Sequence, residues 1–140
     1  MLDEGEFQRW MRQAEHTLES AERDRSERDY AWACFKAEQA AQCALKALLI
    51  SIGQVAHGHS LRRLIRQVEA SGFSVPSSVV TAAEGLERHY IPSRYPDAYP
   101  EGSPFEFYHD EQAQEALRWA DHIIDFVWEA FRSVQRASTS

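Results

Sequence analysis

The stretch from Tyr30 to Ile52 reads YAWACFKAEQAAQCALKALLISI, and it decides the fold. Its charged residues are Lys36, Glu38 and Lys46, so we expect neighbouring elements to cover this helix on several sides. Small residues recur at helical spacing and would let another helix approach closely; they are Ala33, Ala37, Ala40, Ala41, Ala44 and Leu48. Residue 53 is a glycine, which predicts the end of the helix. The chain is therefore expected to be built around this central helix.

Helical patterns also lie on both sides of the central stretch. Apolar residues recur three and four positions apart over roughly residues 4–26 and again from about Asp110 to about Val134. Between them, Ser60 is placed to cap a helix of about ten residues. Ser77 or Ser78 is placed to cap a fourth helix, which would extend to Tyr90.

These patterns predict the fold class. Strand-like alternation of useful length is absent from the sequence, so the protein is expected to be all-α. Three long and two shorter helices with short connections predict an antiparallel up-and-down bundle of four to five helices. We expect one domain over residues 1–136 and a disordered tail over residues 137–140.

Composition excludes several classes of protein. The net charge of −7 argues against broad coating of nucleic acid, whose nonspecific affinity comes from Lys and Arg. No apolar run approaches the ~20 residues needed to span a bilayer, and the acidic start lacks the pattern of a secretory signal, so a cytoplasmic protein is expected. His57 and His59 lack a third ligand nearby, so neither a metal site nor a cofactor is predicted.

A proline-rich loop interrupts the helices at residues 88–99, which read RHYIPSRYPDAY. Proline fixes φ and removes a backbone donor, so continuous helix is not expected here. The arginine fork matches phosphate or carboxylate, and tyrosine offers a stacking face with a polar tip. Arg94 and Tyr95 are therefore candidates for binding a nucleotide or phosphate. The alternative is that Arg94 ties the loop to the last helix through Asp121 or Asp125.

The order and spacing of several motifs resemble the HEPN domain family over most of the chain. The motifs are Tyr30 and Phe35, Gln39-Ala40-Ala41, Ala44-Leu45-Lys46-Ala47-Leu48, His59-Ser60-Leu61 with Leu64, Tyr90 to Asp97, and the helix of Ala113, Ala116 and Ala120. The resemblance implies a helical bundle that commonly forms homodimers. It also implies a nucleotide- or RNA-related role, often beside a minimal nucleotidyltransferase partner in a toxin–antitoxin pair.

The sequence departs from the family at Gln42, where proteins that resemble it often carry glutamate, and at a motif that bears on catalysis. Many proteins that resemble it carry an arginine followed four to six residues later by histidine, which implies a metal-independent RNase site. No histidine follows Arg94 at that spacing, so enzyme activity is not expected and no catalytic residue is assigned. If the protein is an RNase, Arg94 with a relocated His59 would carry it, since this cleavage needs a proton-transfer group and a cation.

Two further residues have open alternatives. Lys46 shares a helix face with Phe35, Gln39 and Gln42, and it either holds a phosphate or extends its ammonium to water. His59 either belongs to the site or bonds to backbone at the start of a helix. His89 is expected to be solvated at a helix end.

Three functions remain open at this point. The first is a nucleotide-binding or protein-interaction module, acting as the HEPN component of a toxin–antitoxin-like pair, with Arg94, Tyr95, Lys46 and His59 as its site. The second is a divergent RNase toxin. The third is a purely structural partner subunit.

Overall fold

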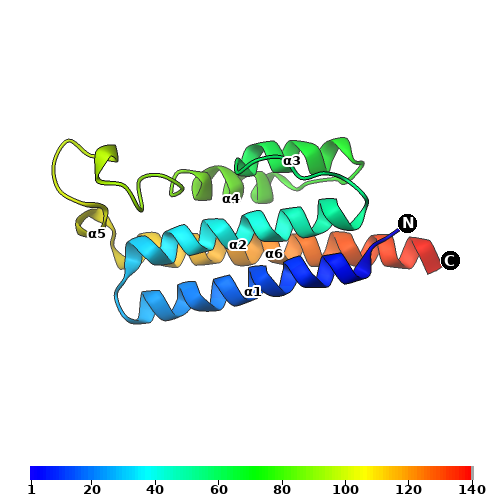
Figure 1. Ribbon diagram of the computed structural model, residues 1–140, viewed down its shortest axis with the longest axis horizontal. Helices are drawn as coiled ribbons and strands as arrows, with labels where there is room; N and C mark the ends of the chain where they lie inside the picture. Colours follow the sequence, from blue (N-terminus) through cyan, green and yellow to red (C-terminus); the bar gives the residue numbers. More distant parts are fainter. Residues whose placement is uncertain (140) are drawn as a thin grey trace.

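Three long helices form the body of the protein in a computed structural model that describes residues 1–139 (Figure 1). They are α1 (Glu4–Ser26), α2 (Tyr30–Ser51) and α6 (Asp110–Thr139). Neighbouring helices α1 and α2 run antiparallel, and both chain ends lie at the same end of the bundle. Within the described residues there are helices and no strands, which confirms the all-α bundle predicted from the sequence.

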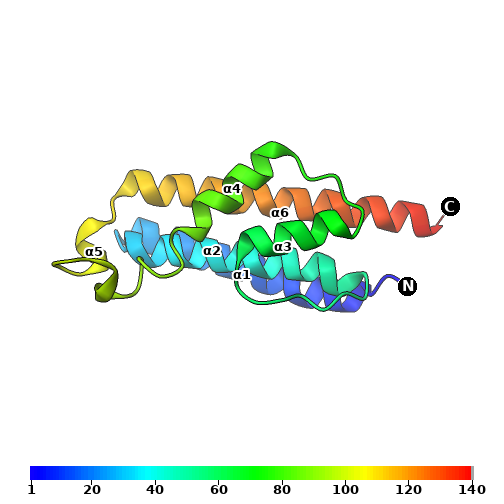
Figure 2. The same cartoon turned by 90° about the horizontal axis from the view of Figure 1, so that it is seen from above.

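Two shorter helices cover one side of the long ones (Figure 2). These are α3 (Leu61–Ala70) and α4 (Ser77–Glu87), and α4 packs mainly on α6. A short 3₁₀ turn, η1 (Pro96–Ala98), and one helical turn, α5 (Pro104–Phe107), shape the loop that joins α4 to α6. This loop lies at the end of the bundle away from the chain termini.

Helix α2 is central, as its composition predicts. Its alanines at 33, 37, 40, 41, 44 and 47 are all fully buried, because both α1 and α6 pack against it. A small side chain lets a neighbouring backbone come close, while α2 also contributes the large buried side chains of Leu45, Leu48 and Leu49 to the core. Phe7 of α1 stacks on Phe131 of α6 with ring centroids 3.6 Å apart.

The helix boundaries follow local chemistry at most ends. The Asp3 side chain accepts from the backbone N–H of Glu6 at 3.0 Å and caps α1. The Ser60 hydroxyl accepts from the N–H of Arg63 at 3.2 Å, which confirms the predicted cap of α3. Gly53 follows α2 with φ of 83°, a left-handed conformation that glycine adopts without strain.

Three predicted boundaries differ from the structure. Helix α4 was expected to extend to Tyr90 but ends at Glu87, and residues 88–94 form turns. The expected serine cap of α4 is wrong: Pro76 occupies the cap position and no side chain caps the helix, because proline already fixes the extended backbone there. The disordered tail was expected from residue 137, but α6 continues through Thr139, while Ser140 lies outside the described residues. Polar residues alone did not end a helix that packs along α1 and α2.

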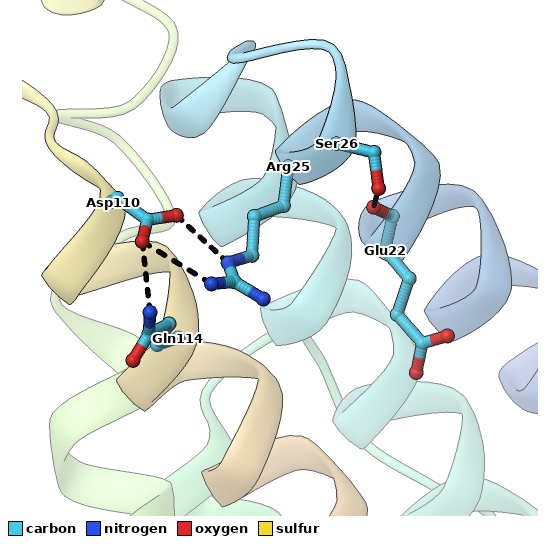
Figure 3. A network of polar contacts seen from close by, with 5 residues as sticks. All are labelled: Glu22, Arg25, Ser26, Asp110 and Gln114. Carbon is cyan, nitrogen blue, oxygen red and sulfur yellow. Dashed lines mark hydrogen bonds and ion pairs between the residues drawn. The ribbon is translucent and has the colours of Figure 1, made fainter.

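An ion pair joins the helices at the loop end of the bundle (Figure 3). Arg25, near the end of α1, donates from Nε and Nη2 to the two carboxylate oxygens of Asp110, at 2.8 and 3.2 Å. Gln114 also donates to Asp110, at 2.8 Å. Since Asp110 is the first residue of α6, the Arg25–Asp110 pair fixes the point where the loop between α4 and α6 ends.

The helices of residues 1–139 also bear on membrane insertion. No helix in that part of the chain combines the length and apolar character that a crossing of the bilayer requires.

Candidate functional site

The proline-rich loop folds back on the first turns of α2, and its Arg94 side chain lies against aromatic rings. The Arg94 guanidinium carbon lies 4.2 Å from the ring centroid of Phe35 and 4.8 Å from those of Tyr90 and Tyr95. Its Nε and Nη2 also donate to the backbone carbonyl of Tyr90, at 3.0 and 2.9 Å. Cation–π contact and hydrogen bonds together hold the guanidinium in one position.

Arg94 carries its charge without a carboxylate partner. Among residues 1–139 it forms no ion pair, so the predicted tie to Asp121 or Asp125 is wrong. The reason is geometric: the guanidinium instead contacts aromatic rings of α2 and the loop, and it donates to the Tyr90 carbonyl. A cation fixed by rings and a neutral carbonyl keeps its charge available to an anion.

A cavity opens beside Arg94. It has a volume of about 330 Å³, at the lower end of the range for small-molecule sites. Trp32 and Phe105 line it, and their side chains are 43% and 71% exposed. These exposed faces beside a fixed cation offer a planar apolar surface next to a charge. That combination suits a ligand with an aromatic base and a phosphate.

The His59 side chain contacts one of the same aromatic residues, Tyr90. Its ring stacks on Tyr90, with centroids 5.7 Å apart and an interplanar angle of 16°. Its Nδ1 lies 3.3 Å from the Oε1 of Gln42 on α2. The favoured expectation that His59 bonds to backbone is wrong, because a side-chain amide on the central helix provides the partner. Tyr90 thus connects His59 to Arg94.

A buried carboxyl lies directly beneath His59 and Gln42. Glu38 is fully buried and accepts from Gln39 Nε2 at 2.8 Å and from Gln42 Nε2 at 2.6 Å. Burial raises the pKa of the Glu38 carboxyl to about 7 and the charge of Glu87 adds to the rise, although the two amide donors and the charge of Arg94 act in the opposite direction. A buried carboxyl that titrates near neutral pH is typical of functional sites.

Glu87, at the end of α4, connects this region to the start of α3. Ser60 donates to Glu87 at 2.5 Å, and Arg62 Nε donates to it at 2.8 Å. Burial acts to raise the pKa of the Glu87 carboxyl, but these hydrogen bonds outweigh burial and lower it. The ionised carboxylate therefore fixes Ser60, and with it the backbone next to His59.

The structure brings three of the four predicted site residues together and leaves one apart. Arg94 and His59 both contact the ring of Tyr90, and Tyr95 contacts Arg94. Lys46 lies eleven residues beyond Phe35 on α2, roughly 16 Å along the helix axis, and four residues beyond Gln42, the partner of His59, roughly 6 Å along the axis. Within residues 1–139 it forms no ion pair and no hydrogen bond with the other three. Its extension to solvent stays the simpler interpretation, since its side chain is only partly buried.

Sequence reasoning missed two features of the site. His89 was expected to be solvated, but its Nδ1 lies 2.9 Å from the Tyr108 hydroxyl, and burial lowers the pKa of the imidazole to about 4. Glu38 was noted only as a charged residue of the central helix. Its spacing of four residues from Gln42, on a helix of alanines, was the signal that could have found the buried polar group.

Metal ligands do not gather in the described part of the chain. Over residues 1–139 no group of three His, Cys, Asp or Glu side chains lies close enough to hold a metal ion. The chemistry on offer at the site is therefore that of a fixed cation, aromatic faces, an imidazole and a buried carboxyl.

An all-α bundle with a cation-bearing loop at one end defines a small helical-domain protein. The model of the HEPN domain family matches residues 7–131, so the chain belongs to the HEPN family. Similar solved structures cover most of the chain. TT1696 from Thermus thermophilus is 45% identical, with a TM-score of 0.85 over 88% of this chain and 96% of its own.

Two further relatives have the same fold or sequence pattern. ST0689, described as an archaeal HEPN homologue, is 35% identical with a TM-score of 0.76, covering 89% of this chain and 97% of its own. A protein of Methanocaldococcus jannaschii named "Putative toxin MJ1304" is 27% identical over 126 residues, which are 84% of this chain and 83% of that protein.

Proposed function

We propose that this HEPN domain protein binds a nucleotide at the loop end of the bundle, as the HEPN component of a toxin–antitoxin-like pair. The observation that carries the proposal is the Arg94 guanidinium, which three aromatic rings hold in place without a carboxylate partner in the described chain. A phosphate would pair with Arg94, and the base would lie on the exposed rings of Trp32 and Phe105.

The toxin–antitoxin context rests on similarity. Most of the chain is similar to the Methanocaldococcus jannaschii protein whose name is "Putative toxin MJ1304". A nucleotidyltransferase partner and a homodimer belong to this proposal. An apolar surface at the loop end supports assembly, because several large side chains there are exposed: Trp32, Ile91, Tyr95, Phe105 and Phe107.

Calorimetry with ATP tests the binding site. We expect heat of binding with the wild-type protein and loss of about tenfold or more in affinity for Arg94→Ala, since a charge-assisted hydrogen bond is worth roughly 1.5–3 kcal/mol. Arg66→Ala is the matched control, because Arg66 is exposed on α3. Absence of heat at millimolar ATP, or equal affinity of Arg94→Ala and the wild type, would end the proposal.

A second candidate is RNA cleavage by a relocated pair. It is favoured by the contact of both the His59 imidazole and the Arg94 guanidinium with the ring of Tyr90. The imidazole would take the proton of the ribose 2′-hydroxyl as its oxygen bonds to phosphorus, and the guanidinium would stabilise the charged phosphorane. The bond from phosphorus to the 5′ oxygen would then break, and the imidazolium would return the proton to that leaving oxygen. Incubation of purified protein with RNA decides this candidate. Intact RNA, together with normal growth on induced expression, removes it.

Assembly is tested separately from ligand binding. Light scattering should give the mass of a dimer for the purified protein, and co-purification from the native host should recover a nucleotidyltransferase in a stable complex. A monomer that captures no such partner would contradict the assembly part of the proposal, while leaving the calorimetry unaffected.

A further inference from the structure

The geometry around Glu38 assigns a hydrogen-bonding role to His59. We infer that Glu38, acting through Gln42, holds His59 with its proton on Nδ1, so that His59 offers the lone pair of Nε2 to a hydroxyl or amino group of the ligand. The claim about the ligand group that His59 binds rests on the proposed function and extends it. The claim about which nitrogen of the imidazole carries the proton does not rest on the proposed function.

The first step concerns Glu38 and Gln42. An ionised carboxylate only accepts hydrogen bonds, and Gln42 Nε2 lies 2.6 Å from Glu38 Oε2. Glu38 is fully buried and Gln42 is 2% exposed, so water cannot replace either partner. Gln39 turns its own amide nitrogen to the other carboxylate oxygen, at 2.8 Å. The carboxylate therefore fixes which end of the Gln42 amide points to it.

The second step passes from Gln42 to His59. With its nitrogen on Glu38, Gln42 presents Oε1 to His59 Nδ1 at 3.3 Å. An amide oxygen is an acceptor only, so Nδ1 has to carry the hydrogen. In a neutral imidazole the other nitrogen is then unprotonated. Two residues on α2 thus set the tautomer of a side chain that lies seventeen residues further along the chain from Gln42.

The third step concerns the exposed side of the imidazole. His59 is exposed, and its Nε2 has no hydrogen-bond partner in residues 1–139. Stacking on Tyr90 fixes the plane of the ring, and Tyr90 also lies under Arg94. An acceptor and a cation that contact the same ring offer different interactions: Arg94 takes an anionic group, whereas the lone pair of His59 repels phosphate and accepts from a donor. A ribonucleotide carries both kinds of group.

Nuclear magnetic resonance of the ligand-free protein tests the tautomer directly. The two ring-nitrogen shifts of His59, assigned with a His59→Phe variant, should report Nδ1–H as the main neutral form at a pH of about 8.5, where Glu38 is ionised. Glu38→Gln should lose this preference, because a neutral amide at 38 lets Gln42 face either way. Glu69→Gln, at an exposed site on α3, should behave as the wild type.

Exchange of the two side chains provides the rescue. In the double variant Glu38→Gln, Gln42→Glu, the carboxylate at 42 accepts from Nδ1 and the amide at 38 donates to it, so the Nδ1–H form should return. A main Nε2–H form in the wild type, or a Glu38→Gln variant with the wild-type ratio, would overturn the inference. The wild-type spectrum decides the matter even if a variant does not fold.

Ligand binding tests the second half of the inference. His59→Phe keeps the stacking on Tyr90 and should weaken ATP binding by about three- to tenfold, the value of one hydrogen bond, while leaving inorganic tripolyphosphate binding unchanged. Arg94→Ala should weaken both. Equal weakening of both ligands by His59→Phe would show that His59 contacts phosphate instead. If neither ligand binds the wild type, the proposed function fails, but the tautomer experiment stands.

Discussion

The Arg94 guanidinium lies 4.2 Å from the ring centroid of Phe35, and this contact joins the proline-rich loop to the central helix. Phe35 belongs to α2, the most buried helix of the bundle, whereas Arg94 comes from a loop that follows α4. The proline-rich loop is therefore anchored to α2 through Arg94. Any change at Arg94 is expected to affect both the loop conformation and the site.

Two substitutions of Arg94 should separate the contribution of its charge to stability from that of its planar shape. Arg94→Ala loses contact with three rings and two hydrogen bonds to the Tyr90 carbonyl, so we expect the free energy of unfolding to fall by about 1–3 kcal/mol. Arg94→Lys keeps the charge but not the planar fork, and should recover less than half of the loss. Urea denaturation measures both, with Arg66→Ala as the control. A change below about 0.5 kcal/mol for Arg94→Ala would contradict this anchoring role.

The fold could be predicted because its signals are local. The alanine spacing from Ala33 to Ala44 identified the central helix, and Ser60 identified the start of α3. The end of α6 was not predictable in the same way. Its last turns contain serine and threonine, which lower helix propensity, and residues 136–138 are exposed, yet the helix continues to Thr139 because propensity is only a weak preference.

The site was predicted only in part, because much of it depends on contacts between distant residues. Arg94 and Tyr95 could be found from their residue types in a proline-rich loop. The pairing of Gln42 with His59 and of His89 with Tyr108 joins residues that are seventeen and nineteen positions apart, on different elements. Sequence spacing carries no information on such pairs until the loop path is known.

Glu38 should make stability depend on pH near neutrality. Its pKa is 4.5 in its unperturbed state and about 7 in the fold, so between these values the unfolded chain binds fewer protons. Stability is therefore fully present below about pH 4.5 and falls as the pH rises through about 7. Relative to the wild type, Glu38→Gln should become more stable by roughly 2–3 kcal/mol between pH 5 and pH 8.

Urea denaturation at several pH values measures this difference. Comparison with the wild type removes the contributions of all other groups, and Glu69→Gln provides a carboxyl-to-amide control on the surface of α3. Parallel stability profiles for the wild type and Glu38→Gln would show that Glu38 titrates normally.

His89 should act in the opposite direction and at lower pH. Burial lowers the pKa of its imidazole from 6.5 to about 4, so on acidification the unfolded chain gains a proton before the folded one does. This contribution is fully present above about pH 6.5 and is lost as the pH falls through about 4. His89→Asn removes the titration and keeps a polar group near the Tyr108 hydroxyl.

We expect the free energy of unfolding of His89→Asn to fall less steeply than that of the wild type as the pH is lowered. Between pH 6.5 and pH 4 the wild type should lose roughly 2–3 kcal/mol more than the variant. His16→Asn, at an exposed position of α1, should follow the wild type. Circular dichroism during urea titration measures the three proteins. An equal acid loss in the wild type and His89→Asn would mean that His89 is solvated in the folded protein.

Gly85 should not tolerate a methyl group, although it lies within a helix. Glycine in a helix interior costs about 1 kcal/mol relative to alanine, so helix propensity alone predicts that Gly85→Ala stabilises α4. The structure predicts the reverse: a Cβ at Gly85 would lie 2.4 Å from the ring of Trp119 on α6. Overpacking of this kind costs typically 1–3 kcal/mol, and we expect a net loss of about 1 kcal/mol or more.

The sign of the change tests whether α4 lies this close to α6. Gly5→Ala is the matched control, because its Cβ would meet only Asp3 Oδ1 at an ordinary 3.6 Å, and it should be neutral or slightly stabilising. Trp119→Leu should relieve the clash, so Gly85→Ala should cost less in that background than in the wild type. Thermal melts of the four variants and the wild type measure these effects. A higher melting temperature for Gly85→Ala would mean that α4 and α6 are further apart than the structure shows.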